Sequence, residues 1–344
     1  MAWKRYDDQG YVRPELLIKE LPATIVLAVG GRNIGKTFGL LQYMLRGDIP
    51  FIYMRTTRPE LELSAEPDFN PFKKLAAANG WTVDTKMRKN MATFTVTDDA
   101  AGWSRVVHGL ALTDAGMVRG VSYDDVDVCF YDEFVPIAPP TKRRGNDYTL
   151  LSDFLGTANR DRELIGRPPL RAVCTGNANR IDCPIIRGAG VMGPAARLYG
   201  RESMQHVLVL PEQSLAMVSY RDSEKAQEME RTESAKIARG AYRDMAFGNM
   251  FADMDESGVK QQPLQEYRAL FIEGEIAVWQ HKAKMGWYHV TPCAMAEGAV
   301  KFAYSDLRAK KELQAIQYRV DMGGAGCTWH NLECKLYMAA ECRA

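Results

Sequence analysis

Short apolar runs alternate with amphipathic stretches along the first two thirds of the chain. The mostly apolar runs at 25–29, 51–54, 126–131 and 170–174 are typical of strands buried on both faces of a parallel sheet. Between the first two runs, residues 36–46 place apolar side chains at helical spacing, which predicts a helix joining two parallel strands. The pattern therefore predicts an α/β fold for this part of the chain.

A different pattern follows after about residue 250. Residues 267–278 predict a β-hairpin with its turn at Glu273 and Gly274, and a third strand and two charged helices follow it. Residues 184–200, which are rich in Gly, Pro and Ala, predict irregular structure. We therefore expect three parts: a first domain with its N-terminal lead-in at 1–215, a helical linker at 216–250, and a small α+β domain at 251–344.

The turn after the first predicted strand carries the clearest motif. Gly30-x4-Gly35-Lys36-Thr37 is a complete phosphate-binding loop, set between an apolar strand and an amphipathic helix as this motif requires. The glycines let the backbone approach an anion and aim successive N–H groups at it, aided by the helix N-terminus. Lys36 supplies a charge for the outer phosphates, and Thr37 supplies a hydroxyl for Mg²⁺. The predicted site for ATP and Mg²⁺ is Gly30, Gly31, Arg32, Asn33, Ile34, Gly35, Lys36 and Thr37.

The strand predicted at 126–131 ends in two adjacent carboxylates. Asp132 would hold the Mg²⁺ sphere and Glu133 would deprotonate the attacking water, because phosphoryl transfer needs both tasks at neighbouring positions. Such a pair is a weak signal alone and a strong one downstream of a phosphate-binding loop. After the next predicted strand, Asn177 is either a γ-phosphate sensor or a turn residue, and we favour the sensor. These motifs predict a P-loop ATPase core of the additional-strand class with a catalytic glutamate.

Composition adds little to this prediction. The 344 residues include 44 basic and 43 acidic ones, and the net charge of +1 argues neither for nor against nucleic acid. A basic loop at 141–145 is either solvated surface or a contact to a phosphate backbone, through Lys142, Arg143 and Arg144. The seven scattered cysteines predict reduced thiols. Since we recognise no signal peptide and no apolar run of roughly 18 residues, we expect a cytoplasmic protein with no membrane span.

Across these motifs the chain resembles the phi29-type bacteriophage genome-packaging ATPases. The run Phe51–Arg55 followed by Arg58-Pro59-Glu60-Leu61 is a more specific likeness than the phosphate-binding loop with its Arg32. The resemblance covers most of the chain and weakens after about residue 290. Its further matching segments are 101–103, 130–134, 159–163, 176–178 and 274–279.

The resemblance implies a motor that drives double-stranded DNA into a prohead. Five copies would form a ring at the portal vertex in the host cytoplasm, with each active site between neighbours, and some members of the family also work with a structural packaging RNA. Arg160 would be the arginine finger supplied in trans, with Arg162 as its rival, and Arg58 would contact DNA phosphates. The small domain would be a degenerate RNase H-like nuclease.

One other class of function fits the same motifs. A P-loop small-molecule kinase or phosphotransferase would also use Lys36, Thr37 and Asp132, and the run with Arg160 and Arg162 could serve as its lid. The adjacent Glu133 favours water activation instead. Stimulation of hydrolysis by DNA would distinguish the two.

Overall fold

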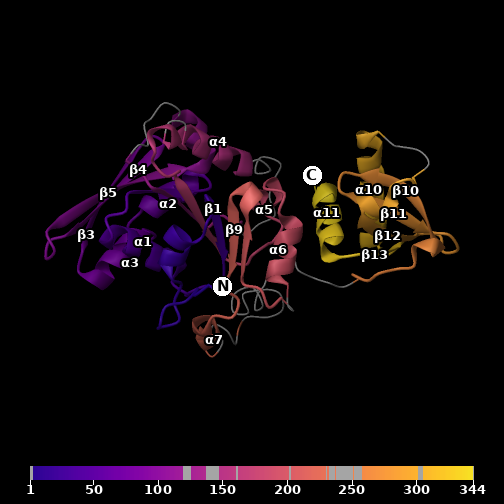
Figure 1. Cartoon of the computed structure of the whole chain (residues 1–344), viewed down its shortest axis with the longest axis horizontal. Coiled ribbons are helices and arrows are strands. Elements are labelled where there is room, and N and C mark those ends of the chain that lie inside the picture. Colours follow the sequence, from indigo (N-terminus) through magenta and orange to yellow (C-terminus); the bar gives the residue numbers. More distant parts are fainter. Residues whose placement is uncertain are drawn as a thin grey trace. The chain divides into compact units, whose positions relative to one another are not determined.

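The computed structural model divides the chain into two compact units, Met1–Asp253 and Met254–Ala344 (Figure 1). Each unit has its own sheet and its own core. The structure describes residues 3–118, 125–136, 147–159, 162–200, 203–229, 231, 237, 251, 258–300 and 305–343.

A nine-stranded sheet forms the centre of the first unit. Its order is β3-β4-β5-β2-β6-β7-β1-β9-β8, and the six strands from β5 to β9 in this order are parallel. The strands are β1 (Ile25–Val29), β2 (Phe51–Arg55), β3 (Thr82–Arg88), β4 (Met91–Asp98), β5 (Trp103–Ala111), β6 (Val128–Asp132), β7 (Arg171–Gly176), β8 (Val207–Leu210) and β9 (Leu215–Ser219). Because β7 lies between β1 and β6, the predicted additional-strand α/β core is confirmed.

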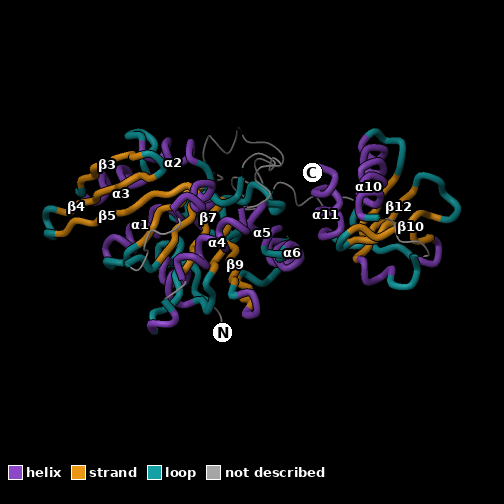
Figure 2. The backbone as a smooth tube through the Cα atoms, turned by 90° about the horizontal axis from the view of Figure 1, so that it is seen from above, coloured by secondary structure: helices purple, strands orange, loops and turns teal. Residues whose placement is uncertain are grey.

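Helices cover the sheet, and apolar side chains from α1 and α3 join its strands in one large core. On other parts of the unit, α4 packs on α5 and α6 packs on β9 (Figure 2). The helices are a π-helical turn at Leu16–Glu20, α1 (Lys36–Arg46), α2 (Arg58–Ala65), α3 (Pro71–Asn79), α4 (Asp147–Asn159), α5 (Pro184–Gly188), α6 (Met192–Tyr199) and α7 (Glu224–Met229), with 3-10 turns at Leu112–Val118, Glu163–Ile165 and Pro211–Gln213. The predicted helix at 36–46 is confirmed at both ends.

Two predictions for this unit need correction. Residues 184–200 are not irregular but form α5 and α6, because Pro184 occupies the first turn of α5, where its missing N–H has no helical partner to lose. The first domain was expected to end at residue 215, where β9 begins; the unit continues to Asp253. Strand β9 is fully buried and pairs in parallel with β1, so it belongs to the sheet that carries the phosphate-binding loop.

The second unit is α+β, as predicted. Its sheet has the order β10-β11-β12-β13, in which the first three strands are antiparallel and β13 is parallel to β12. The elements are β10 (Tyr267–Glu273), β11 (Ile276–His281), β12 (Trp287–Pro292), β13 (Gly326–Trp329), α10 (Asp306–Asp321), α11 (Leu332–Arg343) and 3-10 turns at Leu264–Glu266 and Cys293–Ala296. The hairpin between β10 and β11 confirms the predicted turn, and Gly274 there has a positive φ of 51°. Strand β13 was not predicted because its four residues carry little apolar pattern.

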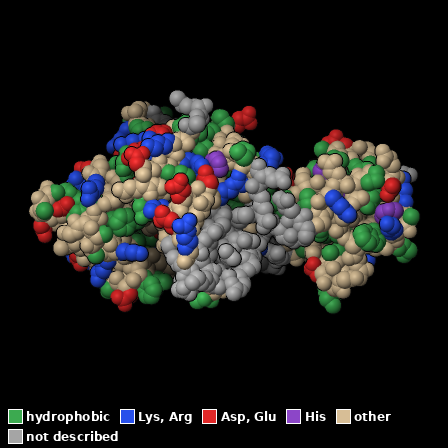
Figure 3. All heavy atoms as spheres, turned by 90° about the horizontal axis from the view of Figure 1, so that it is seen from below, with side chains coloured by type: hydrophobic (Ala, Val, Ile, Leu, Met, Phe, Trp, Pro, Cys, Tyr) green, Lys and Arg blue, Asp and Glu red, His purple; other side chains and the backbone are tan. Residues whose placement is uncertain are grey.

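On the part of the chain that Figure 3 describes, basic and acidic side chains are interspersed over both units, in keeping with the net charge of +1. No helix in the described ranges has the length and apolar character needed to cross a membrane.

Candidate functional site

The phosphate-binding loop connects the carboxyl end of β1 to the first residue of α1. Gly35 precedes the helix in the left-handed conformation, with φ of 81°, which a glycine adopts without strain. At Gly30 any larger residue is excluded by space, since a Cβ there would lie 2.6 Å from Cβ of Tyr220 and 2.7 Å from Cδ1 of Ile34. Both glycines of the motif are therefore required, Gly35 by its backbone conformation and Gly30 by the side chains packed around it.

Lys36 folds back over the loop and is buried there. Its ammonium donates to the carbonyl oxygens of Gly30, at 2.9 Å, and Gly31, and to Oδ1 of Asn177 at 3.1 Å. Burial lowers the pKa of Lys36 to about 8, although the negative charges of Glu133 and Asp132 act in the opposite direction. The amine is thus held in place by acceptors that an incoming anion would partly replace.

Asp132 ends β6 and faces the first turn of α1. The hydroxyl of Thr37 donates to its Oδ1 at 2.9 Å, and the hydroxyl of Thr175 on β7 donates to the same oxygen at 2.8 Å. Tyr53 OH lies 3.4 Å and a guanidinium nitrogen of Arg55 lies 3.7 Å from its Oδ2. A hydroxyl and a carboxylate brought together in this way supply the oxygen ligands that Mg²⁺ prefers, so Thr37 and Asp132 fit the predicted metal site.

Glu133 follows Asp132 in a left-handed backbone conformation with φ of 61°. Its carboxylate accepts from Nδ2 of Asn177, at 3.1 Å to Oε1 and 3.3 Å to Oε2. Burial raises the pKa of Glu133, with Asp132 acting in the same direction and Lys36 opposing it. A carboxylate whose pKa is raised is a better base toward water near neutral pH. The structure thus brings Lys36, Asp132, Glu133 and Asn177 together, as the motifs predicted.

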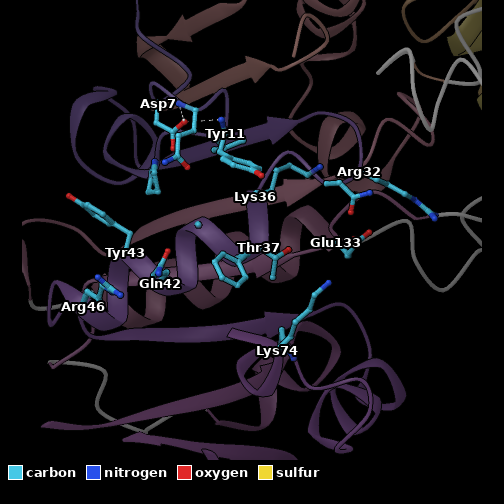
Figure 4. Close-up of a pocket in the computed structure, with 18 of the residues that line it drawn as sticks. Asp7, Tyr11, Arg32, Lys36, Thr37, Gln42, Tyr43, Arg46, Lys74 and Glu133 are labelled. Atoms are coloured by element: carbon cyan, nitrogen blue, oxygen red, sulfur yellow. Dashed lines mark hydrogen bonds between the residues drawn. The ribbon is translucent and has the colours of Figure 1, made fainter. Parts of the chain in front are cut away.

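A pocket of about 1320 Å³ opens over the loop and α1 (Figure 4). Lys36, Glu133 and Asn177 line it together with Arg32 and Arg55. The sequence left open whether Arg55, at the carboxyl end of β2 where α/β sheets bind ligands, contacts a ligand or lies in a solvated loop, and the structure places it in the pocket wall. The N-terminal lead-in supplies a further part of the pocket wall, through Asp7, Gln9, Tyr11, Val12 and Pro14.

The predicted arginine finger lies outside the described residues, and the other candidate, Arg162, is buried inside its own subunit. Arg160 lies outside the described ranges, as do Lys142, Arg143 and Arg144. Arg162 is 1% exposed, donates to the carbonyl oxygens of Val126 and Pro168, and pairs with Asp127 at 3.0 Å. A guanidinium so fully engaged inside its own subunit cannot reach a neighbour's phosphate without breaking these bonds, so the structure argues against Arg162 as the finger.

The other predicted DNA contact lies on the surface. Arg58 begins α2, is about half exposed, and forms an ion pair with Glu62 one turn along the helix, at 2.9 Å. It does not line the pocket. In the described ranges, no group of three or more His, Cys, Asp or Glu side chains is placed to hold a metal ion.

Comparison with known proteins gives a match in fold. Neither a protein-family model nor a curated protein matches the chain. The structure is similar to the Phi-28 gp11 DNA packaging motor, with 16% identity, 98% coverage of both chains and a TM-score of 0.56. It is also similar to a chain of the bacteriophage Phi-29 viral genome packaging motor assembly, with 13% identity, coverage of 96% of this chain and 97% of that chain, and a TM-score of 0.59. The chain therefore has, along nearly its whole length, the fold of these phage packaging-motor proteins.

Proposed function

We propose that this protein is the ATPase of a motor that moves double-stranded DNA into a viral prohead. The observation that carries the proposal is the convergence of Lys36, Thr37, Asp132, Glu133 and Asn177 around one pocket, in a chain that has the packaging-motor fold in both units. The arrangement of these side chains supports a nucleoside triphosphatase. The likeness in fold supports a coupling of hydrolysis to DNA movement.

Each residue of the site has a task in the proposed reaction. The backbone N–H groups of the loop and the Lys36 ammonium would hold the phosphates, and Thr37 with Asp132 would hold Mg²⁺. When bound, Mg²⁺ neutralises charge on the phosphates. Glu133 would take a proton from the attacking water, while Asn177, bonded to both Glu133 and Lys36, would keep the base in line with the phosphate end of the site.

The assembly is part of the proposal. The likeness to motor proteins supports a homo-oligomeric ring, which we take to be a pentamer at the portal, with a packaging RNA as a further partner. Arg160 is proposed as the finger supplied to a neighbour. Arg58 and the cations of the 142–144 loop are proposed to contact DNA phosphates, without reading sequence. The second unit is proposed to be a nuclease-like domain that does not cut.

The test is steady-state ATPase activity of the full chain with and without double-stranded DNA, across a salt series. We expect DNA to stimulate hydrolysis and the stimulation to fade as salt rises, because phosphate contacts release counterions. Glu133→Gln should bind ATP without turning it over. In Arg58→Ala the DNA stimulation should weaken while hydrolysis without DNA stays unchanged, and Lys4→Ala, an exposed lysine of the same unit, is the matched control.

Two results would contradict the proposal. Normal turnover by Glu133→Gln would remove Glu133 as the base. Hydrolysis that is indifferent to DNA at every salt concentration, combined with phosphate transfer to a small molecule, would favour the kinase alternative instead.

A further inference from the structure

A second buried cation lines the pocket, on the side of β6 that faces away from the phosphate-binding loop. Arg55 ends β2, which neighbours β6 on one side, whereas β1 and its loop lie beyond β7 on the other side. The Arg55 side chain is 20% exposed and lines the pocket together with Lys36 and Glu133. Arg55 and Lys36 therefore reach the same pocket from opposite sides of the strand that ends in the two carboxylates.

The guanidinium of Arg55 has hydrogen-bonding capacity that the described residues do not use. Its ion pair with Asp132 spans 3.7 Å from Nη1 to Oδ2, which is longer than a hydrogen bond. Its Nε is buried and has no hydrogen-bond partner in the part of the chain that the structure describes. A guanidinium has five N–H donors, and a buried donor without an acceptor costs free energy. An oxygen-rich ligand in the pocket would satisfy these donors.

The aromatic core below β2 holds the guanidinium in this place. The Tyr53 ring is 1% exposed and packs edge-on against the rings of Phe72 and Phe94. Its hydroxyl lies 3.4 Å from Oδ2 of Asp132 and beside the guanidinium of Arg55. Because Tyr53 and Arg55 are two positions apart on one strand, their side chains leave the same face of the sheet. The polar end of β2 is thus fixed next to Asp132.

Glu133 indicates where the terminal phosphate of a bound nucleotide would lie. A base that activates water must lie within hydrogen-bond reach of that water, which stands in line with the phosphate that it attacks. The terminal phosphate therefore lies between the phosphate-binding loop and the carboxyl ends of β6 and β2. Arg55 supplies a cation on that side, and arginine binds phosphate oxygens through two parallel N–H groups. Since ADP lacks this phosphate, a contact from Arg55 would distinguish the two nucleotides.

We propose that Arg55 binds the terminal phosphate of ATP within its own subunit and so makes the site prefer ATP to ADP. This inference rests on the proposed function, because it assigns a ligand contact in the same nucleotide site. Arg55 touches the substrate, and its long ion pair with Asp132 is the contact that it exchanges for the phosphate. It acts inside the subunit, unlike Arg160, which is proposed to act on a neighbour.

The test measures, by calorimetry on the full chain, the binding of ADP and of the non-hydrolysable ATP analogue AMPPNP, each with Mg²⁺ and again in EDTA. We expect Arg55→Gln to bind AMPPNP about tenfold to 100-fold more weakly, the range for a lost hydrogen bond to a charged group, and to bind ADP as the wild type does. The loss should persist in EDTA, because the contact is to the phosphate itself. Arg55→Lys keeps the charge without the paired donors, so its loss for AMPPNP should be smaller but measurable.

The matched control is Arg46→Gln, which removes the same charge from the same pocket. Arg46 is the last residue of α1, about 15 Å along the helix from Lys36, and it donates to the side chain of Asn79 (Figure 4). Its replacement should leave the ratio of the AMPPNP and ADP affinities unchanged. Thermal melts show whether each variant is folded, and Arg55→Lys replaces Arg55→Gln in the test if the glutamine variant does not fold.

The outcomes separate this inference from a structural role for Arg55. If Arg55 only held Asp132 in place for Mg²⁺, Arg55→Gln would weaken both probes equally and the loss would vanish in EDTA, and either result would overturn the inference. An AMPPNP affinity equal to that of the wild type would also overturn it and leave the ATPase proposal standing. If the wild type binds neither probe, both proposals fail.

Discussion

Asn177 joins the lysine of the phosphate-binding loop to the glutamate that follows β6. Its Oδ1 accepts from Nζ of Lys36 at 3.1 Å, and its Nδ2 donates to Oε1 of Glu133, also at 3.1 Å. An amide can accept from an ammonium and donate to a carboxylate at the same time. The position of Glu133 relative to Lys36 is therefore fixed by a single side chain in the residue that directly follows β7.

Replacing this amide by a carboxylate of the same shape tests that role. Asn177→Asp has no donor for Glu133 and adds a negative charge beside it, so we expect the base to be misplaced and its pKa to rise further. The kcat for ATP should fall by about 100-fold, a loss typical of removing one catalytic hydrogen bond, while KM changes little. A change confined to KM, measured by steady-state hydrolysis, would contradict this assignment.

The lowered pKa of Lys36 predicts that nucleotide binding is coupled to proton uptake. Because burial lowers the pKa of Lys36 to about 8 in the free protein, a larger share of the molecules carries a neutral amine at pH 8.5 than at pH 6.5. Bound phosphates favour the charged form and raise the pKa, so ATP binding at pH 8.5 should take up a fraction of a proton. Calorimetry in two buffers of different ionisation enthalpy measures this number.

A matched measurement at pH 6.5 serves as the control for Lys36. The amine is already protonated there in the free protein, so its share of the uptake should vanish. Equal uptake at both pH values would assign the proton to another group.

Two arginines near the end of α4 should respond differently to truncation. Arg162→Ala removes a fully buried side chain and the donor that holds the carbonyl oxygens of Val126 and Pro168, and we expect it to lower the free energy of unfolding by about 2 kcal/mol. Arg160→Ala, as the proposed finger, should leave the melting temperature unchanged and reduce turnover. Thermal melts and hydrolysis rates of both variants check this.

Mixing experiments give a sharper result for Arg160. Inactive Arg160→Ala subunits should regain activity when mixed with inactive Lys36→Ala subunits, because some interfaces then combine an intact finger with an intact loop. Absence of rescue at every mixing ratio would argue against a site shared between subunits.

The second unit should lose stability in mild acid because of His289. This side chain is fully buried, and burial, with the neighbouring His330, lowers its pKa to about 4. An unfolded histidine binds its proton near pH 6.5, so the unfolded state gains protons first as the pH falls. Stability is therefore full above about pH 6.5 and decreases toward pH 4, by about 2 kcal/mol at pH 4.5.

The variant His289→Gln isolates this effect. Its Nδ1 partner, the Thr328 hydroxyl at 2.8 Å, can still bond to an amide, and glutamine does not titrate. Unfolding of the variant should depend less on pH than that of the wild type between pH 7 and 4.5. An identical pH profile, measured by denaturant unfolding of the full chain, would assign the acid sensitivity elsewhere.

The central residues of the site could be predicted from the sequence because they belong to short local motifs. The loop at 30–37 and the pair Asp132-Glu133 depend on short-range rules of backbone and charge, and the hydrophobic runs place them at the ends of neighbouring strands. The lead-in could not be read in this way. The ion pair between Arg5 and Asp222 joins residues that are 217 positions apart in the sequence, so no local pattern predicts it. Strand β9 was missed because Pro211, which precedes it, is typical of the end of a strand and suggested that the sheet ended there.

Arg162 shows a different limit of sequence reasoning. Two arginines two positions apart are equivalent in a motif, and the burial of Arg162 among groups of its own subunit is what argues against it as the finger. Which role an arginine serves depends on groups such as Val126 and Asp127, which lie far from it in the sequence.

The backbone of Glu133 has a consequence for how this protein can change. For a non-glycine residue, a φ of 61° costs on the order of 1 kcal/mol of conformational free energy. The cost is smaller for asparagine and absent for glycine. Selection for thermal stability alone would therefore favour Gly or Asn at position 133, whereas selection for ATP turnover would keep Glu there. In a mutational scan that scores folding and activity separately, this position should give opposite rankings.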